Sequence, residues 1–195
     1  MKNTKTRRAF GVGIAALGLV AGTAATAAAH TPIILANNDV VPWTSPLVLD
    51  GTNPVALFGD LPQCGSVRAA QFDMKAGQTV MLAYGVPDEA PENQLPAADL
   101  PDLLLVAPDG TLTVLKPVTS QVTPTEQGFD LDLVNMYSAP AEQGTYSVLA
   151  IGGCTPVRFV VAMGQDPGGF AGVLRGQVAT DAQVQQWYDT PANAS

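Results

Sequence analysis

The sequence predicts an all-β fold, an antiparallel and jelly-roll-like β-sandwich of about nine short strands followed by a short C-terminal helix. Short apolar runs, many with period-two alternation, recur along the chain, and no run of helical period separates them. The 19 glycines and 16 prolines mark frequent turns. Hydrophobic residues make up 47% of the 195 residues, which is enough for one core.

Nine segments carry the strand pattern: 47–49, 55–58, 67–74, 78–84, 102–107, 111–116, 129–134, 145–151 and 157–163. The segment 102–107 is apolar almost throughout, which predicts a strand buried on both faces. Alternation in 129–134 predicts that Phe129, Leu131 and Leu133 point inward.

Prolines and polar residues predict the connections between the strands. Four prolines place residues 86–101 in a loop, because proline cannot sit in a central strand. Residues 117–127 are expected to form a polar loop. The sandwich is therefore expected over residues 30–165, with an extension over residues 166–195.

The extension carries a helix signal. Thr180 and Gln183 have the spacing of a capping box, which predicts a short helix running to Tyr188. Val184 and Trp187 supply further apolar side chains, so we expect this helix to lie on the sandwich.

Residues 1–29 have the layout of a cleavable signal peptide. Four basic residues precede an apolar stretch over 9–20 and a small-residue run that ends at Ala29. We expect cleavage after Ala29 or one to three residues earlier, and a secreted or extracytoplasmic protein. The pair Arg7-Arg8 resembles a twin-arginine signal, so both the Sec and the twin-arginine routes remain open. No second apolar run is long enough to cross a bilayer as a helix, so no membrane span is expected after cleavage.

Charge restricts the partners. Removal of residues 1–29 leaves five basic and seventeen acidic residues, a formal net charge of −12. Such a field repels polyanions, which argues against nucleic-acid binding. A protein or a glycan of the cell envelope remains as a partner, and the sequence does not predict the oligomeric state.

The two cysteines, Cys64 and Cys154, predict a disulfide, since an even count is typical of exported domains. Closing the loop between them stabilises the fold by about 4–5 kcal/mol at most in the chain-entropy model. The alternative, a metal-thiolate pair, lacks further ligands nearby in the sequence.

Three segments resemble the pre-peptidase C-terminal type of bacterial secreted domain, a jelly-roll-like sandwich. They are a strand and Ala-Gly-Gln turn over 71–78, a strand and Pro-Asp-Gly turn over 102–110, and a Gly-x-Tyr start of the closing strand over 143–148. The resemblance covers about residues 66–163 and implies a non-catalytic domain that here stands alone. Leu104 and Val106 replace the outward acidic residues of that family, so the resemblance implies no shared ligand site.

Catalytic motifs are scarce. His30 is the single histidine and precedes the folded region, and no Gly-x-Ser-x-Gly motif occurs, which argues against Ser-His-acid and Cys-His catalysis. We therefore expect a non-catalytic protein with a binding or structural role. A small carboxylate-dependent hydrolase remains the alternative. Four acids in or beside the proline-rich loop are interpreted as a solvated face: Glu89, Glu92, Asp99 and Asp102.

No cofactor is required by the sequence, and two metals are considered. Cleavage after Ala29 would make His30 the N-terminus, where its amine and imidazole could bind copper. Calcium prefers loop carboxylates. The candidates are Asp99, Asp102 and Asp109, with Asp130 and Asp132 also available. No loop has the EF-hand spacing.

Trp43 and Trp187 are the candidate ligand-binding aromatics, because an exposed indole can stack on a sugar ring. Aromatic residues total only 6%, so no dense sugar-stacking face is predicted. Trp43, beside Pro42, could instead plug one end of the sandwich. Tyr146 is expected in the core.

Overall fold

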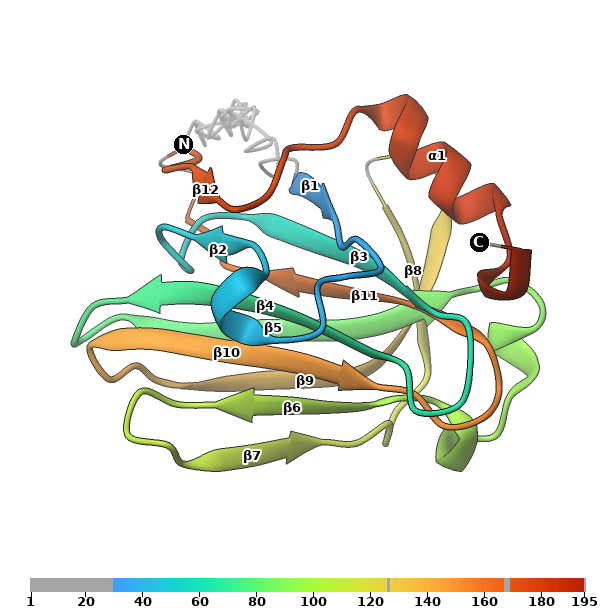
Figure 1. Ribbon diagram of the computed structural model, residues 1–195, viewed down its shortest axis with the longest axis horizontal. Helices are drawn as coiled ribbons and strands as arrows, with labels where there is room; N and C mark the ends of the chain where they lie inside the picture. The colour runs from blue at the N-terminus through green and yellow to red at the C-terminus, as the bar shows by residue number, and fades with distance from the viewer. Residues whose placement is uncertain (1–29, 126, 167–168, 195) are drawn as a thin grey trace, which may run out of the picture.

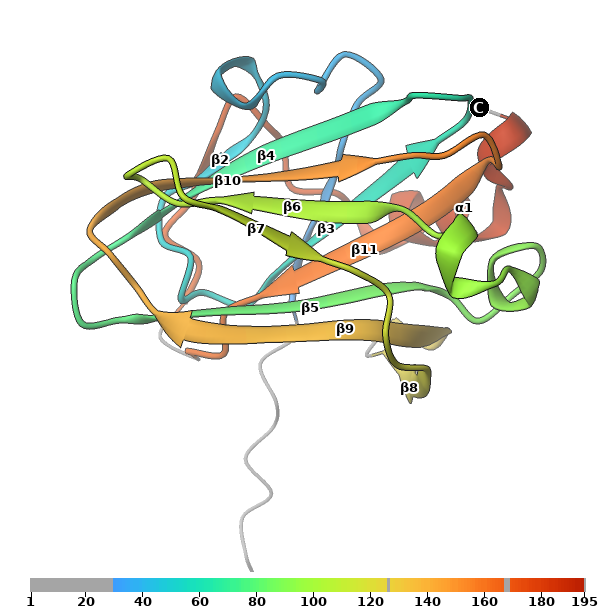
Figure 2. The ribbon, with the colours of Figure 1, turned by 90° about the horizontal axis from the view of Figure 1, so that it is seen from below.

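A computed structural model describes residues 30–125, 127–166 and 169–194. Two six-stranded sheets lie face to face with one short helix against an outer face (Figures 1 and 2). The predicted all-β sandwich is confirmed. The predicted signal peptide lies outside the described residues.

The first sheet has the order β1-β3-β11-β5-β9-β8. Its strands are β1 (Thr31–Ile34), β3 (Val55–Leu61), β11 (Val157–Met163), β5 (Thr79–Pro87), β9 (Asp130–Pro140) and β8 (Gln121–Pro124). The second sheet has the order β12-β2-β4-β10-β6-β7. Its strands are β12 (Val173–Leu174), β2 (Leu47–Val48), β4 (Val67–Met74), β10 (Gly144–Ile151), β6 (Asp102–Val106) and β7 (Leu112–Leu115).

Most neighbouring strands run antiparallel, and the exceptions lie toward one side of the sandwich. The pairs β1–β3 and β2–β4 are parallel. The helical elements are α1 (Asp181–Asp189) and four single turns of 3-10 helix: η1 (Pro42–Thr44), η2 (Glu92–Gln94), η3 (Ala97–Asp99) and η4 (Ala192–Ala194).

The main core fills the space between the sheets and follows the period-two rule. Alternate residues of β4 and β11 point into it, among them Phe72 and Phe159. Tyr146 stacks on Phe72 with ring centroids 5.3 Å apart, which confirms its predicted place in the core.

A second, smaller core lies on the outer face of the first sheet, under α1. Val184 and Tyr188 of the helix pack there against Phe58 and Phe129. The predicted capping box is present, because the Thr180 hydroxyl accepts from the backbone N–H of Gln183 while the Gln183 side chain accepts from the backbone N–H of Thr180. The helix therefore starts where the sequence predicted.

Three strands were not predicted from the sequence. β1 and β12 are edge strands of four and two residues, too short to show a period. β8 lies inside the predicted polar loop 117–127, so that prediction was wrong in part. β5 extends to Pro87, which was assigned to a loop; the pairing of β5 with β11 ends at Gly85, so the proline is paired only with β9.

Two burial predictions need correction. The strand β6 is not buried on both faces, since Leu104 and Val106 are half-buried on the outer face of the second sheet. Phe129 and Leu131 are buried, but against α1 rather than between the sheets, and Leu133 is half-buried beside a cavity on the same outer face. A β-bulge between Tyr84 and Gly85 shifts the register of β5 against β9 and changes which residues face the core.

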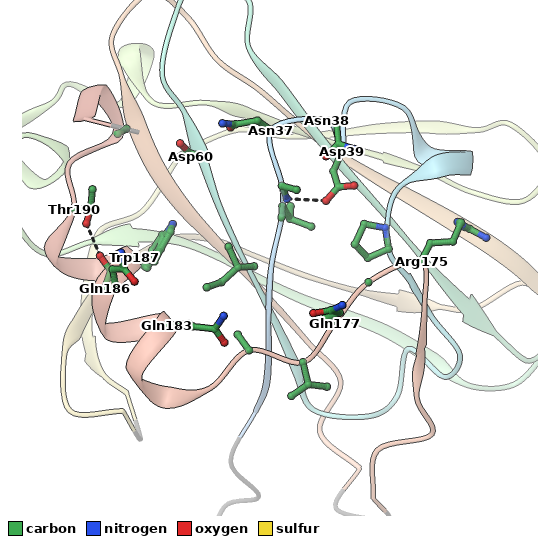
Figure 3. A pocket seen from close by; sticks show the side chains of 18 of the residues that line it. Asn37, Asn38, Asp39, Asp60, Arg175, Gln177, Gln183, Gln186, Trp187 and Thr190 are labelled. Atoms are coloured by element: carbon green, nitrogen blue, oxygen red, sulfur yellow. Dashed lines mark hydrogen bonds between the residues drawn. The ribbon is translucent and has the colours of Figure 1, made fainter.

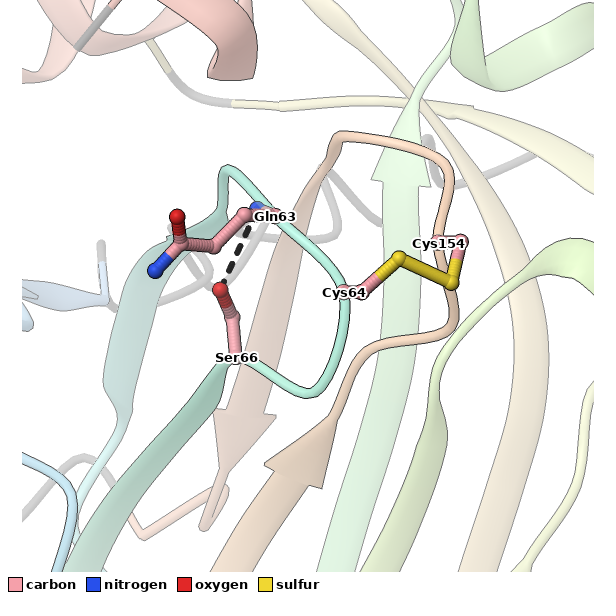
Figure 4. Close-up of a disulfide and its surroundings, with 4 residues drawn as sticks. All are labelled: Gln63, Cys64, Ser66 and Cys154. Atoms are coloured by element: carbon pink, nitrogen blue, oxygen red, sulfur yellow. Dashed lines mark hydrogen bonds between the residues drawn. A yellow bond between two sulfur atoms is a disulfide. The ribbon is translucent and has the colours of Figure 1, made fainter.

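The predicted disulfide between Cys64 and Cys154 is confirmed, with Cα atoms 3.9 Å apart. It joins the β3–β4 loop to the β10–β11 loop (Figure 4). Gln63 and Ser66 brace the first loop through a hydrogen bond of 3.2 Å. Within the described residues, no helix has the length and hydropathy needed to cross a membrane.

Candidate ligand-binding cleft

An open cleft of about 660 Å³ lies between two segments that are far apart in the sequence. One wall is the end of β1 with the segment 35–39 after it, and the other runs from Arg175 through α1 to Ala192 (Figure 3). An isolated bridge between Ile33 and Val178 and a bond from the Ala179 N–H to the Pro32 carbonyl hold the two segments together. We call this cavity the polar cleft.

Beside a slightly larger number of apolar residues, seven of its nineteen lining residues carry uncharged polar side chains. Five carry amides: Asn37, Asn38, Gln177, Gln183 and Gln186. Gln177, Gln183 and Gln186 lie on the C-terminal wall (Figure 3), and the amide oxygen of Gln183 is engaged with Thr180 in the capping box. The amides of Asn38, Gln177 and Gln186 make no hydrogen bond to any described residue, so they can donate to and accept from a ligand.

Asp39 is the most buried carboxylate of the polar cleft, with 7% of its surface exposed. Its Oδ2 accepts a hydrogen bond of 2.7 Å from the Ala36 N–H and so closes the turn after β1. Burial raises the pKa of Asp39, while the bond from Ala36 and the charge of Arg68 act in the opposite direction. This carboxyl group therefore holds a proton at higher pH than an exposed aspartate does.

Asp60 and Asn37 are held from behind by a buried arginine. The guanidinium of Arg68, on β4, donates to Asp60 Oδ1 at 3.1 Å and to Asn37 Oδ1. It also donates to the Val67 carbonyl at 3.0 Å. Arg68 is 4% exposed, and its Nε has no hydrogen-bond partner among the described residues. The arginine thus fixes two cleft residues while one of its own donors stays unsatisfied.

Arg175 supports the rim rather than the interior of the cleft. It adopts a positive φ of 58°, and its Nε donates to the Ser45 carbonyl at 3.0 Å. Its second guanidinium nitrogen donates to Gln71 Oε1 at 2.9 Å. In Figure 3 the side chain points away from the middle of the cleft. Its charge is therefore directed to the second sheet.

The two tryptophans lie differently. Trp187 lines the polar cleft half-buried, with its indole N–H 3.3 Å from the Gly59 carbonyl and its ring edge-on to Phe58. Trp43, in η1, is 71% exposed, so the interpretation as a plug was wrong. Its neighbour Thr44 lines the cleft. Trp187 therefore lines the polar cleft. Trp43 does not line it, although the next residue in the chain does.

The proposed metal ligands are not brought together. Asp102 and Asp109 flank opposite ends of β6: Asp102 pairs with Lys116 at 3.2 Å, and Asp109 accepts from the backbone and hydroxyl of Thr111. His30 lines a different, apolar cavity. In the part of the chain that the structure describes, no three His, Cys, Asp or Glu side chains group as a metal site. Asp99 is exposed in η3, and the calcium and copper hypotheses stay predictions.

Glu92 corrects the interpretation of the proline-rich loop as a solvated face. It is 1% exposed and binds the guanidinium of Arg158 through both oxygens at 2.9 Å. Burial opposes the charge of Arg158, but the bonds to Glu92 outweigh it and hold the pKa of Arg158 above its usual value. Arg158 also donates to the Tyr188 carbonyl, which ties the loop and the end of α1 to β11.

Comparisons of the sequence with known families and with curated proteins found no match. No model of a known protein family matches the chain. No curated protein is significantly similar to it in sequence. The function must therefore be argued from the chemistry of the site.

Proposed function

We propose that the chain is an exported, non-catalytic β-sandwich protein that binds a neutral, polyhydroxylated ligand such as a glycan in the polar cleft. One observation carries the proposal: an open cleft of about 660 Å³ whose lining includes five side-chain amides, three of them without a hydrogen bond to described residues. Amides match sugar hydroxyls well, since each can donate and accept in one plane.

The remaining lining residues suit the same ligand. Trp187 offers an apolar edge at one side of the cleft, and carbohydrate sites combine such a surface with a few convergent polar groups. Arg175 is engaged outside the cleft, so its charge is not directed at a phosphate there. The formal charge of −12 for residues 30–195 further disfavours a polyanionic ligand.

The proposed export rests on the signal-like segment 1–29 and is compatible with the disulfide, which persists in oxidising compartments. Expression of the full chain in a bacterial host should yield an extracytoplasmic protein whose N-terminus is His30 or lies one to three residues earlier. Intact-mass measurement tests this. A cytoplasmic product that keeps residues 1–29 would contradict the proposal.

The glycan proposal is tested by screening the exported protein against bacterial, fungal and plant glycans and then measuring the affinity of the best ligand by calorimetry. Gln186→Ala and Gln177→Ala should each weaken binding about 5–10-fold, because a hydrogen bond contributes about 1 kcal/mol. Gln185 is the matched control: it precedes Gln186 on α1 and bonds Asp189 instead of lining the cleft. Equal loss in Gln185→Ala and Gln186→Ala would contradict the proposal.

A carboxylate-dependent hydrolase at the same cleft is the second candidate. One observation favours it: Asp39, whose pKa is raised by burial, and Asp60, which is paired with a cation, line one cavity. Glycoside hydrolysis uses two carboxyl groups in one site, and a raised pKa suits the one that acts as the acid. Incubation of any glycan that binds, followed by measurement of new reducing ends, separates the two functions. Turnover abolished by Asp39→Asn with binding retained would favour the hydrolase.

A further inference from the structure

A second cavity lies on the outer face of the first sheet. It has a volume of about 400 Å³ and borders the small core under α1, with which it shares Phe58, Leu131 and Val160. The helix covers one part of this sheet face, and the cavity occupies the part beside it. A volume of this size is within the range of about 300–1,000 Å³ that small-molecule sites have.

Strand register explains why the sheet surface is hollow here. Ala162 of β11 is opposite both Ala56 of β3 and Ala83 of β5. Ala83 is in turn opposite Met136 of β9. Three alanines thus form a row across neighbouring strands, between rows with larger side chains such as Phe58 and Val160. We call this cavity the alanine groove.

The length of the row follows from sheet geometry. Four strands take part, and three spacings of about 4.8 Å give a row about 14 Å long. The row is one residue wide. A single extended aliphatic chain matches this narrow, elongated shape better than a ring system does.

Methionines make the groove adaptable. Met81 and Met136 line it, whereas Met163, which borders it, is 2% exposed and packs in the main core. Met136 is 68% exposed, an unusual position for a side chain with this apolar surface. Methionine is flexible and polarisable, and it is common at surfaces that accept apolar partners of variable shape.

Charge identifies the ligand class. The chain has seventeen acidic and nine basic residues, yet none of the described residues lining the alanine groove is an Asp, Glu, Lys or Arg. The polar lining residues flank the row, with His30 and Gln165 beside β3 and β11, and Thr123 and Thr125 in or next to β8. Amides and hydroxyls suit an uncharged polar head group, and the net charge of −12 repels an anionic one.

We propose that the alanine groove binds the aliphatic chain of a monomeric, uncharged single-chain lipid, with the polar head at the hydroxyl- and amide-bearing margin. Burial of an apolar chain against the described lining, which carries no Asp, Glu, Lys or Arg, is favourable, because each buried methylene leaves water. Membrane lipids in an anionic bilayer are the less suitable source, since the net charge of the protein opposes approach to that surface. This site is separate from the polar cleft and does not depend on the proposed glycan binding.

The test uses the exported protein and monolauroylglycerol as the probe, below its critical micelle concentration. We expect saturable binding to one site by calorimetry. Dodecanoate and dodecyltrimethylammonium have the same chain length with charged heads, and we expect both to bind more weakly. Tighter binding of either charged amphiphile, or no binding of monolauroylglycerol, would overturn the proposal.

Variants locate the site. Ala162→Phe fills the middle of the row and should weaken binding by about tenfold or more with an unchanged melting temperature, because Ala162 is only half-buried. Met136→Lys is a second variant at an exposed position, for use if Ala162→Phe does not fold. Leu112→Lys is the matched control, since Leu112 is 55% exposed on the other sheet. Equal effects of control and groove variants would refute the site.

A second copy of the chain is the rival occupant. Light scattering on the purified protein distinguishes the two. A monomer that binds monolauroylglycerol agrees with the proposal. A dimer that Ala162→Phe converts to monomers would show that the groove is a self-interface and would overturn it.

Discussion

Two buried arginines, Arg158 and Arg68, show how differently one side chain can be used in one sandwich. Arg158 is 1% exposed and makes a bidentate pair with Glu92, which is equally buried and also accepts from the Arg158 backbone N–H. Arg68 is 4% exposed and binds Asp60 and Asn37. Its Nε has no partner among the described residues, whereas the guanidinium of Arg158 is bound at each of its three nitrogens.

The difference in hydrogen bonding suggests different roles: Arg158 stabilises the fold, whereas Arg68 positions residues of the polar cleft. A fully bonded buried pair fixes one geometry, here the joining of the proline-rich loop, β11 and α1. The partners of Arg68, by contrast, both line the polar cleft. A buried donor that is left unsatisfied costs stability, and a role in a nearby site is one explanation for it. Two variants test this interpretation, and two further ones test the cleft and the helix beside it.

Glu92→Ala should have the largest effect. It leaves the charge of Arg158 buried without its bidentate partner and with only Glu89 at 4.0 Å, which costs about 3–5 kcal/mol of unfolding free energy. Urea denaturation measures this. The double variant Glu92→Leu/Arg158→Met should regain most of the loss, because it removes both charges. A double variant as unstable as Glu92→Ala would contradict the account.

Arg68→Met should cost less, about 1–3 kcal/mol, because one donor is already unsatisfied and Asp60 is partly exposed. Its larger effect should fall on glycan binding, since Asp60 and Asn37 lose their support. Denaturation and calorimetry on the same preparation measure both. A loss of stability equal to that of Glu92→Ala, with unaltered binding, would remove the distinction between the arginines.

Asp39→Asn tests the cleft by pH. Because burial raises the pKa of Asp39 above 3.8, the folded state binds its proton more tightly than the unfolded state does. The resulting stability is present in full below pH 3.8 and is lost as the pH rises through the folded pKa. The wild type should therefore lose stability relative to Asp39→Asn on going from acid to neutral pH. A pH-independent difference between the two proteins would be inconsistent with this reasoning.

Thr180→Ala should have the smallest effect, about 1 kcal/mol, through loss of the helix cap. It tests whether α1 is stabilised mainly by its N-terminal cap or by the packing of Val184 and Tyr188 and the hydrogen bond from Arg158. Thermal unfolding measures it, and a loss comparable to that of Glu92→Ala would show that the cap dominates.

The sequence predicted those strands that are long enough to show an alternating apolar and polar pattern. β4 and β11 were predicted with their observed bounds, since each is long enough to show one face in the core. β1, β8 and β12 have two to four residues and pair at sheet edges, where no alternation can develop. The disulfide was predictable because only two cysteines exist.

The candidate site was largely beyond sequence reasoning. Trp187 was named in advance, but the amides of the cleft come from two segments near opposite ends of the described chain, and no local pattern brings them together. Glu92 was taken for a solvated acid because its partner Arg158 lies far along the sequence. A lone Arg in an otherwise apolar strand, as Arg158 is in β11, was the one available signal, since a charge there requires a buried partner.

The polar cleft depends on the docking of the C-terminal extension against the segment that follows β1. One wall follows β1 and the other follows β12, so the cavity exists only after the C-terminal extension has docked across the finished sandwich. Proteolytic cleavage within residues 175–180 should leave both sheets folded, because all strands precede this segment. It should nevertheless destroy the cavity, because one wall of the cleft begins there. A molecule cut there should keep its disulfide and both sheets but lose the proposed ligand binding.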